Sequence, residues 1–561
     1  MTKYIGITIG PIDRIATYVK SSHSIWASSY IFSFLVKHII LHLKETCKIE
    51  DGNFITPVIT NDMFEPSPVG RFSDQYVIQI EGEGEEADNK ANRIIEETNK
   101  ATNTILDDIA KDINEQIKKA NINDIKEYLK RVIKVYVIEK YLTGEVSNVV
   151  RDFQNSFAAM ECFDTYQQVE SRNYLAEYFQ SKTEPKTKLL VKDTNEDTNN
   201  EKGQAKNRMF SSILECSAQI EPEDLEKYEN GNNDNNLKTF QKYIAFVAAD
   251  GDNFGKTIAK LEEKSKYFTD FSSKLREAVA SYGGQTIFQG GDDILFFAPT
   301  HNPDSELSKG NKATDVSTDG TSTHNPNNSS KKDDSEEKIT DIFSLIKYID
   351  DLFEEMVIKK LKEKDENGKC VWDGLKDKPS LSYGVAIAYY KHPMNEIRQR
   401  ANDLLYKCKN DYNRNTIAWE VCKHSGQTFS GVIDKKEEKP EEKGQSVFAQ
   451  MLSLISKSIP KPNLTKAGED IDNNFLHSIT HWIMSHKEII ESVILKNPQK
   501  EKLLENYFNN NFNEDSHKSK KEFIEAIREF LLIGNLKEPC ANLHAILRYV
   551  ELLINKSEHG K

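Results

Sequence analysis

Apolar positions in the first part of the chain predict an α/β arrangement in which short strands are separated by long helices. Residues 4–9 form an apolar strand that Gly10-Pro11 breaks, and residues 54–55 and 76–80 predict two further strands. The apolar stretch at residues 25–43 contains lysine and histidine side chains. We therefore expect a buried amphipathic helix there and no membrane span.

Helical spacing dominates the stretch that follows. Residues 81–119 are charged and carry regularly spaced alanine and isoleucine, which predicts a solvated helix, and residues 122–179 are again predicted to be helical. The Asn- and Glu-rich residues 222–236 lead into the next domain. We expect an α/β domain with a helical extension over residues 1–150 and a helical linker domain over residues 151–236.

A second α/β pattern begins with residues 243–249, a continuous apolar run that is typical of a central strand buried on both faces. The elements predicted after it are a helix reaching residue 279, strands 286–288 and 294–297, helix 339–361, strand 381–388, helix 395–410 and strand 416–421. The order strand–helix–strand–strand–helix–strand is that of the ferredoxin-like split unit. We expect this domain to cover residues 237–434, with a polar, disordered insertion at residues 301–338.

The last part of the chain is helical throughout. A charged linker at residues 435–443 is followed by apolar residues at helical spacing to the end, which predicts a small helical bundle over residues 445–561. A chain of 561 residues is too long for one core, so several domains are expected. The predicted fold class is α+β.

The charge balance limits how the protein meets nucleic acid. With 75 basic and 89 acidic residues, the chain has a formal net charge of −14. A global positive field that grips nucleic acid is therefore not expected. The composition still allows a local basic groove, or nucleic acid that is held mostly by partner subunits.

The cysteines indicate a reducing compartment. Seven are scattered along the chain without a C-x-x-C pair, which argues against a disulfide scaffold and against a zinc site formed by neighbouring residues. The N-terminal residues lack a basic region followed by an apolar core, so no signal peptide is expected. We expect a cytoplasmic protein.

The strongest chemical signal is the run Gly290-Gly291-Asp292-Asp293, which leads into an apolar strand. Adjacent carboxylates repel each other unless a cation screens them, and carboxylate oxygens are hard ligands that suit Mg²⁺. Antiparallel pairing would bring this turn beside Asp250, at the end of the strand 243–249. Asp250, Asp292 and Asp293 could then hold two Mg²⁺ ions, or Mn²⁺ in their place.

Small residues near these carboxylates leave room for a nucleotide. Gly290 and Gly291 let the backbone turn tightly and let triphosphate oxygens approach. Gly251, Gly255 and the backbone near Asn253 could surround the triphosphate. One metal ion would lower the pKa of an attacking 3′-hydroxyl, and the other would stabilise the departing pyrophosphate.

A structural explanation competes with this one. Gly and Asp dominate hairpin turns, so Gly-Gly-Asp-Asp alone is compatible with an ordinary turn. Asp250 before Gly251 is likewise compatible with a strand-ending Asx turn. The combination of both features, at this spacing and on these strands, favours an active site.

These motifs resemble the large signature subunit of type III CRISPR effector complexes, particularly the III-B (Cmr) branch. The residues that carry the resemblance are Ile7-Thr8-Ile9-Gly10-Pro11-Ile12, Trp26-Ala27-Ser28-Ser29-Tyr30, Ala249-Asp250-Gly251-Asp252-Asn253-Phe254-Gly255, Gly290-Gly291-Asp292-Asp293 and Leu381-Ser382-Tyr383-Gly384-Val385-Ala386, together with residues 395–409 and from 415 onward. The second α/β pattern is also similar to the palm domains of diguanylate and adenylate cyclases.

The resemblance implies two ferredoxin-like palm domains, of which only the second is catalytic, with helical domains between and after them. It implies synthesis of an adenylate second messenger from ATP when guide RNA pairs with target RNA inside a complex with other Cmr-type subunits. It also places Phe254, Ser382 and Lys409 near the nucleotide. A non-catalytic scaffold that organises guide RNA and partners is the alternative, and a stand-alone cyclase acting on GTP is a third hypothesis.

Two departures from the family pattern shape the expectation. Many relatives begin with a His-Asp nuclease domain, whereas this chain starts at the first palm, so we expect no DNase activity. Relatives often carry a Cys-rich zinc element between the palms, and residues 171–216 contain no paired cysteines. The product is left open between cyclic oligoadenylate and AMP joined to S-adenosylmethionine, with S-adenosylmethionine then serving as a co-substrate.

Overall fold

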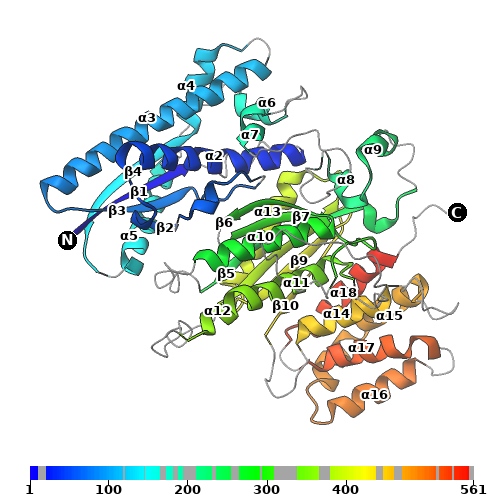
Figure 1. Ribbon diagram of the computed structural model, residues 1–561. Coiled ribbons are helices and arrows are strands. Elements are labelled where there is room, and N and C mark those ends of the chain that lie inside the picture. The colour runs from blue at the N-terminus through cyan, green and yellow to red at the C-terminus, as the bar shows by residue number, and fades with distance from the viewer. Residues whose placement is uncertain are drawn as a thin grey trace, which may run out of the picture.

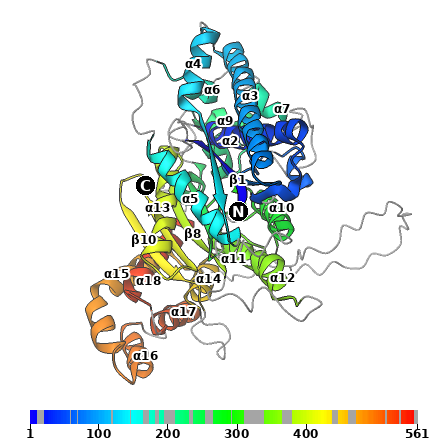
Figure 2. The ribbon, with the colours of Figure 1, turned by 90° about the vertical axis from the view of Figure 1, so that its left-hand side faces the viewer.

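Two sheets and a group of C-terminal helices follow one another along the molecule (Figures 1 and 2), so the α+β class is confirmed. The computed structural model describes residues 1–10, 21–57, 59–67, 69–117, 120–144, 146–163, 172–180, 187–193, 210, 212–229, 236–253, 265–290, 293–308, 338–364, 379–436, 446–459, 471–512, 517–533 and 536–554. Figure 2 shows the first sheet at one end, the second sheet in the middle and the C-terminal helices at the other end.

The first sheet has the strand order β2-β3-β1-β4, and all of its pairs are antiparallel. Its elements are β1 (Thr2–Gly10), α2 (Ser22–Cys47), β2 (Phe54–Thr56), β3 (Gln75–Ile80), α3 (Glu85–Gln116), α4 (Ile122–Val132), β4 (Lys134–Leu142) and α5 (Val146–Phe163). Helices α2 and α3 pack on one face of this sheet, and α5 packs on the other.

Strand β4 corrects the helix predicted across residues 122–179. Residues 134–142 pair with β1 along its whole length, from Thr2 opposite Leu142 to Gly10 opposite Lys134. The segment is rich in Val, Ile and Tyr, which favour strands. Its side chains are half-buried on both faces, so the apolar residues show no clean alternation that would have marked a strand.

Helix α2 is longer and more apolar than expected. By length and composition alone it could cross a membrane. However, 83% of its apolar window is buried within the protein, with Ile31, Leu35 and Ile39 fully enclosed. Packing against the first sheet therefore accounts for its hydropathy.

The second sheet has the strand order β10-β9-β8-β5-β7-β6. Its elements are β5 (Tyr243–Asp252), α10 (Ser265–Tyr282), β6 (Gln285–Gly290), β7 (Asp293–Pro299), α11 (Ile342–Phe353), the π-helical turn η9 (Glu354–Ile358), α12 (Lys359–Lys362), β8 (Ser380–Tyr389), α13 (Met394–Asn410), β9 (Thr416–Cys422) and β10 (Thr428–Asp434). Strand β5 lies between β7 and β8 and is antiparallel to both, whereas β8 and β9 are parallel.

The two sheets share one connectivity. Across the first sheet the strands are ordered β2-β3-β1-β4. Across the second sheet the strands β5 to β8 are ordered β6-β7-β5-β8, and β9 and β10 follow beyond β8. In both sheets the order is therefore the second, third, first and fourth strand of the unit. The first strand of each unit is therefore central and is flanked by the third and fourth. At its end β1 carries Gly10, whereas β5 carries Asp250, Gly251 and Asp252.

Alternate residues of β5 enter two different cores. Ala245, Val247 and Ala249 pack with helices α10 and α11 on one face. Ile244, Phe246 and Ala248 pack with α13 and with the short helix α8 on the other face. This burial on both sides explains the continuous apolar run in the sequence.

Two further expectations need correction. The strand predicted at residues 416–421 is not the last, because β10 pairs antiparallel with β9 before the charged linker. The insertion predicted at residues 301–338 is ordered at both of its ends: Leu307 is buried, Ser308 pairs with Lys338, and the N–H of Ile339 donates to the carbonyl of Leu307. Residues 309–337 lie outside the described part of the chain.

Helices connect the two sheets and complete the C-terminal part. The connecting helices are α6 (Tyr174–Gln180), α7 (Lys188–Asp193), α8 (Ile213–Ala218) and α9 (Pro222–Glu229), and the C-terminal elements are α14 (Val447–Ser458), α15 (Asn473–Ser485), the π-helical turn η11 (Ile489–Ile494), α16 (Lys500–Asn511), α17 (Lys521–Leu532) and α18 (Pro539–Ile554). Short 3-10 turns are η1 (Asp51–Asn53), η2 (Asn61–Phe64), η5 (Thr239–Lys242) and η12 (Lys518–Lys520). Apolar residues of the C-terminal helices join the core on the α10–α11 side of the second sheet.

Gly384 lets α13 lie directly on β8. A Cβ atom at this position would stand 2.0 Å from the carbonyl oxygen of Ala401 and 2.4 Å from the backbone nitrogen of Leu405, both in α13. Backbone atoms of a helix cannot yield as the end of a flexible side chain can. Glycine at residue 384 therefore sets the distance between α13 and the sheet.

We expect Gly384→Ala to lower the free energy of unfolding by about 3 kcal/mol, because the added methyl group overpacks the contact between α13 and β8. Chemical denaturation of the full chain measures this effect. Gly52→Ala is the matched control, since a Cβ atom there would meet nothing within 4 Å. Equal stability of the two variants would contradict the assigned role of Gly384.

Candidate functional site

Asp250 lies near the end of β5, on the face of the sheet that α13 covers. The strand pairs with β8 up to Asp252, so Asp250 stands opposite Ser382. On its other side β5 pairs with β7, and Ala249 stands opposite Ile294. One further step in this antiparallel register places Asp250 opposite Asp293, with both side chains on the same face.

Asp293 is the first residue of β7 and is exposed. It pairs with Gly290, the last residue of β6. The positions predicted at Gly291 and Asp292 lie outside the described residues, as do Phe254 and Gly255. Within the described ranges no group of three or more metal-ligating side chains is present.

Lys409 brings a positive charge to Asp250. It lies in the last turn of α13, and its ammonium forms an ion pair with the Asp250 carboxylate. The same ammonium donates to the carbonyl oxygen of Gly251 at 2.9 Å. Burial raises the pKa of the Asp250 carboxyl above its ordinary value, although Lys409 opposes this shift.

Ser382, which stands opposite Asp250 in β8, is buried. Its side chain is fully buried, and its hydroxyl donates to Oδ2 of Asp252 at 2.8 Å. The Ser380 hydroxyl donates to the same oxygen at 2.7 Å. Of the residues predicted near the nucleotide, Lys409 therefore reaches the Asp250 carboxylate, while Ser382 contacts Asp252.

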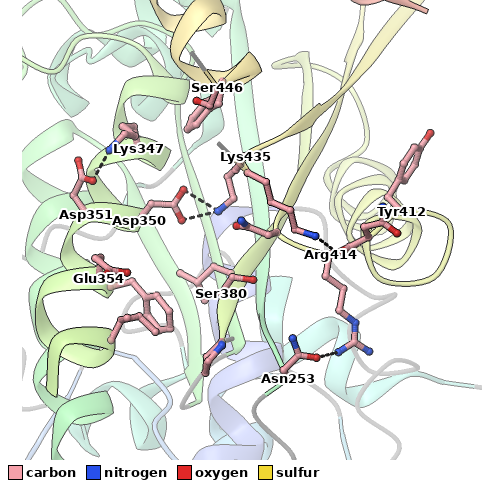
Figure 3. Close-up of a pocket in the computed structure, with 18 of the residues that line it drawn as sticks. Asn253, Lys347, Asp350, Asp351, Glu354, Ser380, Tyr412, Arg414, Lys435 and Ser446 are labelled. Carbon is pink, nitrogen blue, oxygen red and sulfur yellow. Dashed lines mark hydrogen bonds and ion pairs between the residues drawn. The ribbon is translucent and has the colours of Figure 1, made fainter. Parts of the chain in front are cut away.

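A turn with unusual backbone geometry follows α13. Arg414 and Asn415 have φ values of 57° and 50°, in the left-handed region that is unfavourable for residues with a side chain. Arg414 donates from Nη1 to Oδ1 of Asn253 at 2.9 Å, which places its guanidinium beside the end of β5 (Figure 3). Asn253 itself has a φ of 66°.

A cavity of about 1080 Å³ opens next to this turn. Its wall includes Asn253, the residue after β5, Ser380 from the start of β8, and the last turns of α11 with the π-helical turn that follows (Figure 3). Six of its lining residues are basic and three are acidic: Lys347, Lys362, Lys409, Lys435, Lys436 and Arg414 against Asp350, Asp351 and Glu354. The basic excess suits a ligand that carries several negative charges.

A part-buried ion pair supports one wall of the cavity. Lys435, which follows β10, donates from Nζ to both carboxylate oxygens of Asp350 in α11, at 2.7 and 2.8 Å. The hydroxyl of Tyr383 in β8 donates to Asp350 at 2.9 Å. Burial raises the pKa of the Asp350 carboxyl, although Lys435 opposes the shift. Three elements distant in sequence are thus joined at one carboxylate.

The residues present fit a divalent cation and a polyphosphate. Asp250 and Asp293 offer hard carboxylate oxygens on one face of adjacent strands, as Mg²⁺ requires. Lys409 pairs with Asp250 and Arg414 bonds to Asn253, and such side chains can bind phosphate oxygens, Lys as a point charge and Arg with its planar fork.

Sequence reasoning missed two residues of this site. Arg414 lies in a polar loop without a recognisable pattern, and only the fold brings it to Asn253, 161 residues away in the chain. Asp252 was part of the quoted motif but was given no role of its own. A signal existed for Asp252, because it alternates with Asp250 and so shares its face of the strand.

The segment that builds this site is similar to a known protein family. Residues 243–310 and 337–418 match the family described as Cas10/Cmr2, second palm domain. The matched segment contains Asp250, Asp252, Asp293, Lys409 and Arg414. No curated protein sequence shows significant similarity to the chain.

Solved structures resemble the chain weakly over most of its length. A chain in "Type III-B Cmr-beta Cryo-EM structure of the Apo state" is 11% identical, with 90% of this chain and 77% of that chain covered and a TM-score of 0.46. A chain in "Crystal structure of Csm1-Csm4 cassette in complex with AMPPNP" is 10% identical, with 95% and 69% covered and a TM-score of 0.45. A chain in "Crystal structure of Csm1 in T.onnurineus" is 9% identical, with 96% and 70% covered and a TM-score of 0.42. Scores below 0.5 do not establish a shared overall fold.

Lys435→Met should lower the free energy of unfolding by about 1–2 kcal/mol, because it leaves the part-buried Asp350 carboxylate without its cation. The double variant with Asp350→Asn should recover at least half of this loss, since the amide is neutral and still accepts from Tyr383. Urea denaturation measures both. Lys347→Met is the control, because its ion pair with Asp351 is exposed and should matter little. A double variant that is no more stable than Lys435→Met would contradict the account.

Proposed function

We propose that this chain is the large subunit of a type III CRISPR effector complex of the III-B branch. In this proposal its second palm domain is a nucleotidyl transferase that converts ATP into an adenylate second messenger. Support comes from the family match over residues 243–310 and 337–418. The observation that supports the catalytic part is the register of β5 and β7: continued by one pair it would set Asp250 opposite Asp293, and Lys409 forms an ion pair with Asp250.

The proposed reaction joins two nucleotides and releases pyrophosphate. A hydroxyl oxygen of the acceptor attacks the α-phosphorus of ATP. The new phosphorus–oxygen bond forms as the bond to the β-phosphate breaks, and pyrophosphate leaves with the electron pair. Mg²⁺ held by Asp250, Asp292 and Asp293 would help to deprotonate the acceptor and would neutralise charge on the departing pyrophosphate.

The chain's own residues bind and orient the triphosphate. The Lys409 ammonium and the Arg414 guanidinium are the cations nearest to the end of β5 in the described contacts, and both would bind phosphate oxygens. Asn253 orients Arg414 through its side-chain oxygen. Lys409 would exchange its ion pair with Asp250 for one with a phosphate as the charged ligand enters.

We propose that the partners are other Cmr-type subunits, a guide RNA, and a target RNA that switches synthesis on when it pairs with the guide. The net charge of −14 agrees with RNA that is held largely by the partner subunits. The acceptor is either the ribose of a second adenosine, which leads to cyclic oligoadenylate, or S-adenosylmethionine.

The assembled complex with guide RNA should convert radiolabelled ATP and Mg²⁺ into an adenylate product only when target RNA is added. Product mass, with and without S-adenosylmethionine, identifies the acceptor. Asp250→Ala, and the double variant Asp292→Ala with Asp293→Ala, should each reduce product formation by about 100-fold or more, because several kcal/mol of transition-state stabilisation are lost.

Asp403→Ala is the matched control for these carboxylates, since Asp403 lies exposed on α13 and bonds to Gln399. It should leave the rate unchanged. If no product forms under any condition, the catalytic proposal fails and the scaffold alternative stands. Undiminished product from the double variant would refute the site assignment instead.

Arg414→Ala should raise the KM for ATP about tenfold with a smaller change in kcat, because one charge-assisted hydrogen bond to the triphosphate is lost. Steady-state kinetics of the complex measure both constants. Arg400→Ala removes an arginine of α13 whose partner is Glu420 in β9, and it should leave the KM unchanged. An unchanged KM in Arg414→Ala would exclude Arg414 from phosphate binding.

A further inference from the structure

Asp252 lies at the end of β5 and is fully buried. The hydrogen bonds described for its carboxylate all go to one oxygen, Oδ2. Oδ2 accepts from the hydroxyls of Ser380 and Ser382 and from the backbone N–H of Asn415, at 2.7, 2.8 and 2.9 Å. Oδ1 is equally buried and has no hydrogen-bond partner within the described ranges. The side chain is therefore held in one orientation, and it reaches from β5 to the turn that follows α13.

That turn needs external support. Arg414 and Asn415 both adopt left-handed backbone conformations, which persist only where the surroundings impose them. Asn415 is held from two sides: its N–H donates to Asp252, and its carbonyl accepts from the N–H of Lys435 at 3.0 Å. The bond to Asp252 is the one that joins the turn to the strand carrying Asp250.

The side chain held by this turn is Arg414. Its guanidinium bonds to Asn253, the residue directly after Asp252, and lines the cavity (Figure 3). Asp252 and Asn253 thus fix the arginine twice: Asp252 binds the backbone of Asn415, and the side chain of Asn253 binds the guanidinium. Movement of the turn would displace the guanidinium from the position that it holds here.

We propose that Asp252 is a positioning residue for the triphosphate: by holding Asn415 it keeps Arg414 directed at the cavity that Lys409 also lines. This inference rests on the proposed function, since it assumes that Arg414 binds a phosphate of ATP. Asp252 does not touch the ligand, because it is fully buried and its donors come from the protein. Its effect on ATP passes through Arg414.

A double-mutant cycle between Asp252→Asn and Arg414→Ala tests this route. The readout is the equilibrium Kd of the full chain for an ATP analogue with a methylene bridge between the α- and β-phosphates, in the presence of Mg²⁺. Each single variant should raise the Kd about tenfold, and the double variant should stay within about twofold of Arg414→Ala. Independent effects would multiply to about a hundredfold, which would overturn the proposal.

Asp341→Asn is the matched control for loss of a buried carboxylate. Asp341 is buried in the same domain and also accepts from three donors, the N–H groups of Phe343 and Ser344 and the Ser344 hydroxyl, at the start of α11. It should lower the melting temperature as Asp252→Asn does, yet leave the Kd unchanged. Equal losses of affinity in the two variants would mean that Asp252 acts only through stability.

Hydrogen exchange at the turn gives a readout that needs no nucleotide. Asp252→Asn should speed amide exchange across residues 413–416, whereas Asp341→Asn should not. Unchanged exchange in Asp252→Asn would refute the positioning role even if catalysis is demonstrated. Faster exchange and a non-additive cycle, in a complex that makes no product, would keep the positioning role and refute the proposed catalysis.

Ser382→Ala provides a milder variant if Asp252→Asn does not fold. It removes one of the three donors to Asp252 and leaves the carboxylate and its bond to Asn415 in place. We expect a two- to threefold rise in the Kd, which should disappear in the Arg414→Ala background. A rise of the same size in that background would contradict the proposal.

Discussion

The pairing of β5 with a neighbour on each side is the constraint on which the rest of the site depends. Ten residues of β5 are in register with β8, and six are in register with β7. Because side chains alternate along a strand, this double register decides which residues share a face. It brings Asp250, Asp293 and Ser382 together although they come from three strands, and it leaves Ala249 in the core on the opposite side.

Concentrating carboxylates at one end of a sheet has an electrostatic cost that the fold offsets in two ways. Lys409 neutralises Asp250 by direct contact, whereas Asp252 receives three uncharged donors. Both solutions depend on α13, which supplies Lys409 from its last turn and leads directly into the turn containing Asn415. The close seating of α13 on Gly384 therefore affects charge as well as packing.

Connectivity and chemistry are separate properties of this chain. Both sheets arrange their strands in the same relative order, with the first strand central. At the end of its central strand, the first sheet carries Gly10 and the second carries Asp250 and Asp252. The repeated topology thus supplies the same strand end in both sheets, and only the end of β5 carries carboxylate side chains.

Local patterns in the sequence predicted the helices and strands whose apolar residues repeat regularly, and they identified the two carboxylate motifs. The apolar run at residues 243–249 identified β5, and Gly-Gly-Asp-Asp identified its partner hairpin, because both depend on neighbouring residues. Strand β4 was missed because both of its faces are half-buried. Only the tertiary structure joined Asp252 to Asn415 and Arg414 to Asn253, across more than 160 residues. Such contacts have no local period, since their geometry is set by the strand register and by the seating of α13.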